Sequence, residues 1–301
     1  MEYLDEEKVR RVLTYEALIP AMERALQDLS LGRIQQPLRS VLRVAGHDGE
    51  HDGIFALMPA VDGELMGVKL VTIYEKNTGL PTHQATIQLF SAKTGEPLVA
   101  MDGRLITEMR TAAVSAVATR LFAAPEARVL AILGSGVQAR SHLRALRRVR
   151  EFEEVRVWSR TAEHARAFAA EHGAKTADSA EAAARGADVV VSVSSVREPL
   201  VRGEWLGERT LVCAVGAVGP ERRDLDDEAM RAAVVVESRD AAIRESGDLI
   251  GSGAAVYAEI GEVLAGVTPV PEGRVVFKSL GVAAEDVAAA ALVWRAARAV
   301  S

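Results

Sequence analysis

A short apolar run that ends abruptly in closely spaced glycines constrains the fold of this chain more than any other feature. The run spans residues 129–133, and the residues beyond the following turn have helical spacing. The turn consists of Gly134, Ser135, Gly136, Val137, Gln138 and Ala139. Gly134 permits a tight turn, Gly136 lets the backbone approach a pyrophosphate, and Ala139 is small enough for the helix to pack on the strand. Because the helix also presents unpaired N–H groups to an anion, this order predicts a dinucleotide-binding site.

The end of the next strand bears on which dinucleotide binds. A site for NAD usually has Asp or Glu about 20 residues beyond the glycines, where the carboxylate binds the ribose 2′-hydroxyl. Here the strand predicted at residues 155–158 is followed by Ser159, Arg160 and Thr161, with no carboxylate. A guanidinium between two hydroxyl groups suits a 2′-phosphate, so the sequence favours NADPH over NADH. The alternative is that residues 159–161 only cap the following helix.

Length, charge and cysteine content restrict the class of protein. The 301 residues are enough for two domains, and acidic and basic residues are interspersed to a net charge of −6, which gives no indication of a nucleic-acid partner. The single cysteine, Cys213, can form no internal disulfide and no metal cluster, which suits a reducing cytoplasm. No apolar run approaches the ~18 residues of a membrane span. We therefore expect a cytoplasmic protein without a metal ion or a membrane partner.

The C-terminal half alternates predicted helices with near-continuous β-branched runs. Helices are expected at residues 162–172 and 180–185, and the runs cover residues 187–195, 211–219 and 232–238. Such runs are typical of parallel strands buried on both faces, and their alternation with helices predicts a doubly wound Rossmann sheet. Ligands of these sheets bind at the carboxyl ends of the strands. The predicted cofactor neighbours at those ends are Ser194, Val215 and Gly216.

The N-terminal part of the chain reads as a smaller, separate α+β domain. Asp5 and Thr14 are expected to cap two helices. Strands are expected at residues 38–44, 53–58, 67–75, 83–91 and 97–101. Because turn residues separate them and few helices intervene, they should form a mostly antiparallel sheet. With the alanine-rich helix that closes the chain, this domain is predicted to comprise residues 1–112 and 283–301, and residues 113–282 the nucleotide-binding domain.

Three cations stand out in the first domain. Lys69 shares a strand face with apolar residues, where an ammonium group needs a reason. The alternative is a lysine that reaches solvent at the strand edge. Arg39 begins a strand, and Arg110, followed by Thr111, is expected near the start of a helix, where donors favour an anion. Together Arg39, Lys69 and Arg110 would form a carboxylate-binding site, although the sequence does not show that they converge.

Several longer stretches resemble the ornithine cyclodeaminase/mu-crystallin family, and its NADPH-dependent ketimine reductases most of all. They read MPAVDG, KLVTIYE, PTHQATIQLF, MDGRLITEMRTAAVSAVATRLF, LGSGVQARSH, VWSRT, ESGDLIGSG and VFKSLG, in the family's order. The resemblance implies a two-domain fold and a homodimer. The first domain would bind substrate and form the dimer, and the second would be the Rossmann domain.

The resemblance also implies roles for individual residues. Arg39, Lys69 and Arg110 match the family's substrate-carboxylate region, with Lys69 and Arg110 as the catalytic candidates. Residues 134–139 match its pyrophosphate turn, and residues 159–161 match the 2′-phosphate contacts of its NADPH-using members. The family's turn near the nicotinamide corresponds to Lys278, Ser279 and Leu280, and Thr111 is a further cofactor-binding candidate.

One position departs from the pattern of the ornithine cyclodeaminases. Those enzymes carry an aspartate after the fifth strand, in a GGD-type stretch, that acts on the substrate amine. The corresponding residues here are Gly216, Ala217 and Val218. Valine can neither ionise nor form a hydrogen bond through its side chain, so Val218, a substrate-binding candidate by position, argues against ornithine deamination.

We therefore expect an NADPH-dependent oxidoreductase that reduces the C=N bond of a cyclic 2-imino carboxylate, such as Δ1-pyrroline-2-carboxylate or Δ1-piperideine-2-carboxylate. Arg39, Lys69 and Arg110 would hold and orient the carboxylate, and Lys69 is a candidate proton relay. Three alternatives stay open: reductive amination of a 2-oxo acid, as in the family's alanine dehydrogenases; an ornithine cyclodeaminase-type lyase; and an NADPH-dependent protein that binds a small ligand without turnover.

Overall fold

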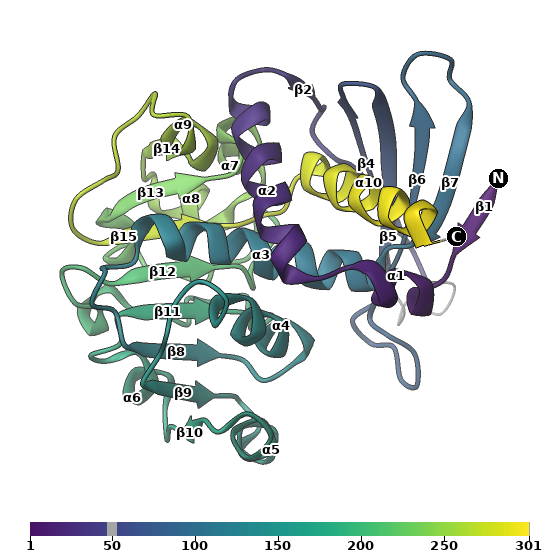
Figure 1. Cartoon of the computed structure of the whole chain (residues 1–301). Helices are drawn as coiled ribbons and strands as arrows, with labels where there is room; N and C mark the ends of the chain where they lie inside the picture. The colour runs from purple at the N-terminus through teal and green to yellow at the C-terminus, as the bar shows by residue number, and fades with distance from the viewer. Residues whose placement is uncertain (47–52, 301) are drawn as a thin grey trace. The chain divides into compact units, whose positions relative to one another are not determined.

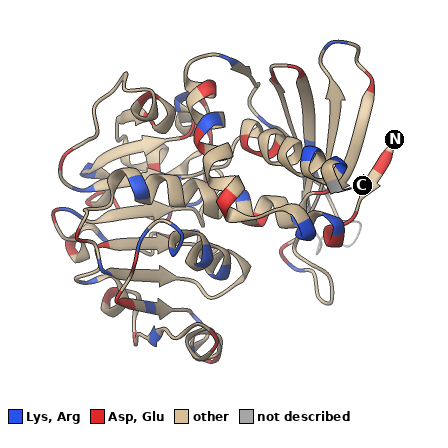
Figure 2. Cartoon of the chain, in the orientation of Figure 1, with Lys and Arg blue, Asp and Glu red and all other residues tan. Residues whose placement is uncertain are grey.

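The structure is a computed structural model that describes residues 1–46 and 53–300. The chain forms two compact units, Met1–Arg110 with Val282–Ser301 and Thr111–Gly281. Each unit contains one β-sheet, and the two sheets share no strand among the described residues (Figure 1). Acidic and basic residues are interspersed over both units (Figure 2). Residues 47–52 and 301, which the sequence analysis assigns to the first domain, lie outside the described residues.

The sheet of the first unit is mostly antiparallel, which confirms the prediction. Its strand order is β1-β7-β6-β5-β4-β2, with β3 also paired to β4, and only the β1–β7 pair is parallel among the described strands. The strands are β1 (Glu2–Leu4), β2 (Ile34–Gln35), β3 (Ser40–Val44), β4 (Gly53–Asp62), β5 (Leu65–Ile73), β6 (His83–Ser91) and β7 (Pro97–Asp102). Strand β4 is longer than predicted, because it continues through Pro59 in register with β5 and ends where Val61 and Asp62 pair with β2.

Helix α10 (Ala283–Val300) covers one face of this sheet, packing on β4, β5 and β6 (Figure 1). Gly67 of β5 lets the helix approach closely, because a Cβ built there would lie 3.1 Å from Val287 Cγ2. Helix α2 (Tyr15–Ser30) packs in turn on α10, and α1 (Glu6–Val12) precedes it. The side chains of Asp5 and Thr14 accept capping hydrogen bonds at the starts of α1 and α2, as predicted. The alanine-rich end of the chain thus completes the core of the first unit.

Helix α3 (Arg104–Phe122) begins earlier than the sequence analysis expects. Asp102 Oδ1 accepts a hydrogen bond from the Arg104 N–H at 2.8 Å, so the helix starts directly after β7. Arg110 consequently lies beyond the first turn of the helix. Since the favourable field for anions is confined to a helix's first turn, the expectation that Arg110 and Thr111 sit at a positive helix end is wrong.

The sheet of the second unit is entirely parallel among its described strands, in the order β10-β9-β8-β11-β12-β15-β13-β14. Its strands are β8 (Val129–Leu133), β9 (Glu154–Trp158), β10 (Lys175–Thr176), β11 (Val189–Ser192), β12 (Leu211–Ala214), β13 (Ala233–Val236), β14 (Val256–Glu259) and β15 (Val275–Lys278). The helices that alternate with them are α4 (Val137–Leu146), α5 (Ala162–His172), α6 (Ala180–Ala184), α7 (Arg239–Glu245), α8 (Gly247–Ser252) and α9 (Ile260–Leu264). This is the predicted doubly wound Rossmann sheet.

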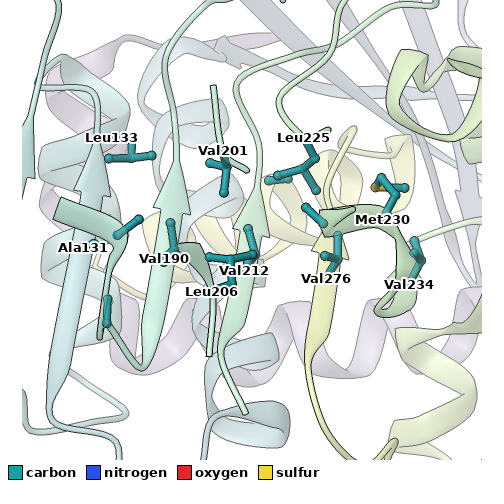
Figure 3. Close-up of a cluster of buried hydrophobic side chains, with 14 of the residues drawn as sticks. Ala131, Leu133, Val190, Val201, Leu206, Val212, Leu225, Met230, Val234 and Val276 are labelled. Atoms are coloured by element: carbon teal, nitrogen blue, oxygen red, sulfur yellow. The ribbon is translucent and has the colours of Figure 1, made fainter. Parts of the chain in front are cut away.

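The core of the second unit includes buried valines, among them Val190 and Val212 of the predicted β-branched runs. Val190, Val212 and Val276, from three neighbouring strands, are fully buried and pack side by side (Figure 3). Strands β11 and β12 are shorter than their apolar runs, because the chain turns away beyond them. A Cβ on Gly216 would lie 2.1 Å from Ser194 O, so the two loops after these strands are in close contact.

Candidate functional site

The glycine turn has the geometry that a bound pyrophosphate requires. Strand β8 ends at Leu133, Gly134 adopts a φ of +127°, and α4 begins at Val137. A side chain at Gly134 would be strained and would crowd the backbone at Val193, whereas a Cβ on Gly136 would meet nothing within 4 Å. The N-cap Gly136 also lacks a side-chain capping bond. The backbone N–H groups at this helix start therefore face open space that suits an anion.

The segment after β9 presents a cation to solvent. Arg160 is exposed and forms no hydrogen bond or ion pair with any residue that the structure describes. Thr161 is the N-cap residue of α5, but its side chain forms no capping hydrogen bond. Ser159 Oγ accepts a hydrogen bond from Ser135 Oγ at 3.0 Å, which ties this segment to the glycine turn. Thr161 thus caps α5 through its backbone, whereas the side chain of Arg160 takes no part in the cap.

The predicted cofactor neighbours at the strand ends do lie together. Ser194 Oγ donates to Leu133 O at 3.1 Å, and the backbone N–H groups of Val215 and Gly216 both donate to Ser192 O. The carboxyl ends of β8, β11 and β12 therefore converge, at the point where the strand order reverses. Open α/β sheets bind their ligands at such points.

Lys278 is completely buried, and a carbonyl oxygen and two carboxylates surround its ammonium. Nζ donates to Ala217 O at 2.7 Å and forms ion pairs with Asp248 Oδ2 at 2.8 Å and Asp224 Oδ2 at 3.1 Å. Burial alone would lower the pKa of Lys278, but the charges of Asp224 and Asp248 outweigh it and raise the pKa above its ordinary value. The ammonium is thus paired within the protein, and a contact between Lys278 and the cofactor stays a prediction. The sequence analysis missed both aspartates.

The turn after Lys278 is fixed by a buried carboxylate that the sequence analysis also missed. Glu237 accepts hydrogen bonds from Ser279 Oγ at 2.6 Å, from the Leu280 N–H at 2.9 Å and from the Gly281 N–H at 3.1 Å. Ser279 and Leu280 are themselves buried. Glu237 follows strand β13, which is the only sequence signal for its position at a strand end.

Val218 is 40% exposed and lies on a rigidly held loop. The neighbouring Ala217 donates its N–H to Asp224 Oδ2, and its carbonyl accepts from Lys278. The exposed group that follows is therefore apolar. The nearby carboxylate of Asp224 is fully buried in its ion pair with Lys278. It therefore does not take the place of the aspartate that ornithine cyclodeaminases carry at the position of Val218.

Lys69 is buried on the sheet face that α10 covers. Only 2% of the residue is exposed, and its Nζ lies 2.7 Å from Asp286 Oδ2. The alternative of a lysine that reaches solvent at a strand edge is therefore wrong. Burial, together with the charges of Arg110 and Arg39, lowers the pKa of Lys69 to about 8 against the opposing effect of Asp286.

Arg110 joins Lys69 at the first turn of α10. Its Nε donates to Asp286 Oδ1 at 3.1 Å and its Nη1 to Glu285 Oε2 at 2.7 Å. Arg39, which is half-buried, is close enough for its charge to affect Lys69. Two of the three predicted cations, Lys69 and Arg110, therefore converge on Asp286, and the two carboxylates that accompany them were missed. The sequence signal that could have identified these carboxylates is the pair of acidic residues at the start of an otherwise alanine-rich helix.

The sheet face around Lys69 opens along the strands. Met58 and Ile87, which flank Lys69 in register, are 3% and 0% exposed. The row of Ile73 and His83, at the far end of β5, is more exposed. The row between them, Val71 with its partner Ala56, is also buried at 8% and 4%, so the accessible part of this face begins beyond Val71.

The described residues provide neither a membrane-spanning helix nor a metal-binding cluster. None of their helices combines the length and the apolar character that crossing a membrane requires. No group of three or more His, Cys, Asp or Glu residues within 1–46 and 53–300 is arranged to hold a metal ion.

Comparison with known proteins confirms the resemblance seen in the sequence. The model of the ornithine cyclodeaminase/mu-crystallin family matches residues 2–300. The ketimine reductase mu-crystallin of Mus musculus is 45% identical over 304 residues, which cover 97% of this chain and 96% of that protein.

Solved structures agree with this result. The Δ1-pyrroline-2-carboxylate reductase of Thermococcus litoralis, in complex with NADH and L-proline, has a TM-score of 0.93 at 35% identity and covers 99% of this chain and 98% of its own. An archaeal alanine dehydrogenase dimer with bound NAD has a TM-score of 0.91 at 31% identity. The match covers 99% of this chain and 96% of the dehydrogenase chain. The chain belongs to the ornithine cyclodeaminase/mu-crystallin family.

Proposed function

We propose that this protein is an NAD(P)H-dependent reductase of cyclic 2-imino carboxylates, such as Δ1-pyrroline-2-carboxylate or Δ1-piperideine-2-carboxylate. The observation that carries the proposal is the buried Lys69 ammonium with Arg110 and Arg39 beside it, in a chain whose second unit holds a dinucleotide turn. Val218 supplies no acid or base for a deamination. The relatives in the family whose names give an activity on a C=N bond support the same reaction.

The cations around Lys69 suit a carboxylate substrate. Glu285 and Asp286 pair with Arg110 and Lys69, and the charge of Arg39 also acts on Lys69. Holding the carboxylate fixes the imine carbon, and the low dielectric of a buried site strengthens that attraction.

Lys69 is the residue that we assign to proton transfer. Bound NADPH or NADH supplies a hydride for the imine carbon, and the nitrogen must gain a proton for the amine to form. With a pKa of about 8, Lys69 is mostly an ammonium at neutral pH and gives up its proton more readily than an ordinary lysine. The neutral amine that remains regains its proton from solvent.

We assign NADPH as the preferred cofactor. Arg160 is exposed with no ion-pair partner in the described part of the chain, and the hydroxyl groups of Ser159 and Thr161 flank it. A 2′-phosphate would accept charge-assisted hydrogen bonds from such a group. In this assignment residues 134–139 and the strand-end residues Ser194, Val215 and Gly216 hold the rest of the nucleotide, with Thr111, Lys278, Ser279 and Leu280 as the further candidates.

We also propose a homodimer formed through the first unit. The sheet face opposite α10 borders a cavity of about 640 Å³ whose lining includes Val61, Met66, Val68 and Phe90. Val61 is 38% exposed in the single chain. An apolar face of this kind needs cover, and the related alanine dehydrogenase is a dimer. Size-exclusion chromatography with light scattering tests this assignment.

The test of the function is oxidation of NADPH, followed by its absorbance, in the presence of Δ1-piperideine-2-carboxylate. We expect rapid turnover that is lost in Lys69→Met while NADPH binding is retained. Ammonia release from ornithine, without reduction of the imine, would contradict the proposal.

Reductive amination of an open-chain 2-oxo acid is a second candidate, because the alanine dehydrogenase shares the fold over 99% of this chain. It requires oxidation of NADPH that depends on ammonia and a 2-oxo acid such as pyruvate. The same assay without the cyclic imine therefore separates the two reactions.

A further inference from the structure

Asp286 is the point at which the two buried cations of the site meet. Its Oδ2 lies 2.7 Å from Lys69 Nζ, and its Oδ1 accepts a hydrogen bond from Arg110 Nε at 3.1 Å. The side chains of Asp286, Lys69 and Arg110 are 0%, 2% and 6% exposed. One carboxylate thus bridges residues from β5 and α3.

The packing of α10 fixes the position of this carboxylate. Asp286 lies in the first turn of the helix, where a negative charge is favoured. The next residue, Val287, packs against Gly67 of the strand that carries Lys69. The distance between Asp286 and Lys69 is therefore set by the closest approach of helix and sheet.

Stability alone does not account for burying these charges. Removing two cations and two carboxylates from water is costly, and a buried ion pair is often no more stable than an apolar pair of the same volume. A network of this cost is expected where it supports a function.

We propose that Asp286 is a positioning residue that holds the Lys69 ammonium in its protonated form and ties it to Arg110. This inference rests on the proposed function in that it assigns Asp286 to the proton-transfer step, in which Asp286 acts only through Lys69. Glu285, which contacts Arg110 alone of the two cations, would position the guanidinium without governing the proton on Lys69.

The charged groups that face Lys69 make this division testable. They are Asp286 and Glu285 of α10, Arg110 of α3, Arg39 before β3, and His83 of β6 with Glu75 beyond the end of β5. Strand β4 contributes the apolar Met58. Burial, Arg110 and Arg39 all lower the pKa of Lys69, and Asp286 is the group that opposes them. Loss of the Asp286 charge therefore favours the neutral amine.

The first test is the pH dependence of kcat for Δ1-piperideine-2-carboxylate reduction in Asp286→Asn, Asp286→Glu and Glu285→Gln. In Asp286→Asn the alkaline limb should move to lower pH by about one to three pH units, because an opposite charge in contact has an effect of that size. Asp286→Glu keeps the charge and should keep the limb near that of the wild type. Glu285→Gln should raise KM for the imino acid and leave the limb in place.

The second test needs no turnover, so it separates failure of this inference from failure of the proposed function. It compares the melting temperature of each protein with that of its Lys69→Met derivative between pH 6 and 10, by dye fluorescence. The pKa of Lys69 is about 8 in the fold and 10.5 when unperturbed. Between those values the unfolded chain binds more protons, so wild-type stability should rise with pH relative to Lys69→Met. In Asp286→Asn this rise should begin at lower pH.

Two results would overturn the inference. In the first, Asp286→Asn leaves both the alkaline limb of the kcat profile and the pH at which stability rises unchanged. In the second, Glu285→Gln moves them as far as Asp286→Asn does. If Asp286→Asn does not fold, the double variant Asp286→Asn/Lys69→Met decides. It should recover folding, because the buried ammonium no longer lacks its partner. Failure to recover would show that Asp286 acts on the fold rather than on Lys69.

Discussion

Ser135 Oγ, in the glycine turn, donates a hydrogen bond to Ser159 Oγ, at the end of β9, across 3.0 Å. The backbone reinforces this contact, because the Gly134 N–H donates to Trp158 O at 2.8 Å. The turn that would bind the pyrophosphate and the segment that would bind the adenosine ribose are therefore joined by two hydrogen bonds. Arg160 is exposed and takes part in neither bond, so its effect on cofactor choice can be measured without disturbing the turn.

Arg160→Ala should reduce the preference for NADPH. Hydrogen bonds to a charged group contribute about 1.5 to 3 kcal/mol, which corresponds to a roughly tenfold to hundredfold rise in KM for NADPH. KM for NADH should change little, because NADH has no 2′-phosphate. Steady-state kinetics with both cofactors measures the ratio.

Arg144→Ala is the matched control for this variant. Arg144 is an exposed arginine of α4 in the same unit, and its replacement changes the net charge by the same amount. Its cofactor ratio should equal that of the wild type. An equal change in both variants would mean that the protein's overall charge, and not a local contact, sets the preference.

Gly136→Ala should weaken nucleotide binding with little loss of stability, whereas Gly216→Ala should lower the stability of the fold itself. A Cβ at Gly136 meets no atom within 4 Å, so the change should lower stability by at most about 1 kcal/mol, the cost of a poorer N-cap. It should nevertheless weaken NADPH binding by at least roughly tenfold, because the methyl group occupies space meant for the pyrophosphate. Fluorescence titration with NADPH and thermal melting of the nucleotide-free protein report the two quantities separately.

Gly216→Ala should destabilise the protein even without nucleotide. Its Cβ would lie 2.1 Å from Ser194 O, a backbone atom that cannot move without disturbing the loop after β11. Unchanged NADPH affinity in Gly136→Ala would contradict the assignment of the pyrophosphate to this turn, whatever the result for Gly216→Ala.

Local sequence patterns were sufficient for the parts of the fold that depend on neighbours in the chain. The strand, glycine turn and helix around Gly134 were predicted, because each element has its own periodicity and the glycines have conformational requirements of their own. The α5 helix was predicted at its observed bounds, whereas β14, a four-residue strand, has too short a pattern to detect.

Partners that come from distant parts of the chain were not predictable. Lys69 stood out in the sequence and Lys278 was implied by the family resemblance, but nothing local connects Lys69 with Asp286 or Lys278 with Asp248. Arg110 was recognised by its residue type, but its position within α3 was predicted wrongly. That position depends on where the helix starts, which the hydrogen bond from the Arg104 N–H to Asp102 sets. Sequence reasoning therefore found the cations and missed the carboxylates that fix them.

His142→Gln should remove a large part of the acid sensitivity of folding. His142 Nδ1 contacts the carbonyl oxygen of Gln138 at 2.8 Å and so carries the proton, while Nε2 accepts from Ser115 Oγ at 3.0 Å. Burial lowers the pKa of His142 to about 4 from 6.5. Between these values the unfolded chain binds more protons, so stability is lost as the pH falls, by about 3 kcal/mol for this group in full. Urea midpoints at pH 7 and pH 5 should differ less in His142→Gln than in the wild type. An identical difference in both proteins would mean that other groups account for the acid sensitivity.

Lys278→Met should be among the most destabilising single substitutions in the second unit. It leaves Asp224 and Asp248, both fully buried, without the ammonium that lies between them. Breaking a buried pair by removing one partner costs about 3 to 5 kcal/mol. It also frees Ala217 O, so the loop that carries Val218 should loosen.

The matched control is Lys175→Met, because Lys175 forms an exposed ion pair with Glu154, and screening by water makes its loss far less costly. Urea unfolding at neutral pH compares the two variants with the wild type. Similar midpoints for Lys278→Met and Lys175→Met would show that the protein tolerates the two aspartates without the ammonium, and that the ammonium is not what holds the loop.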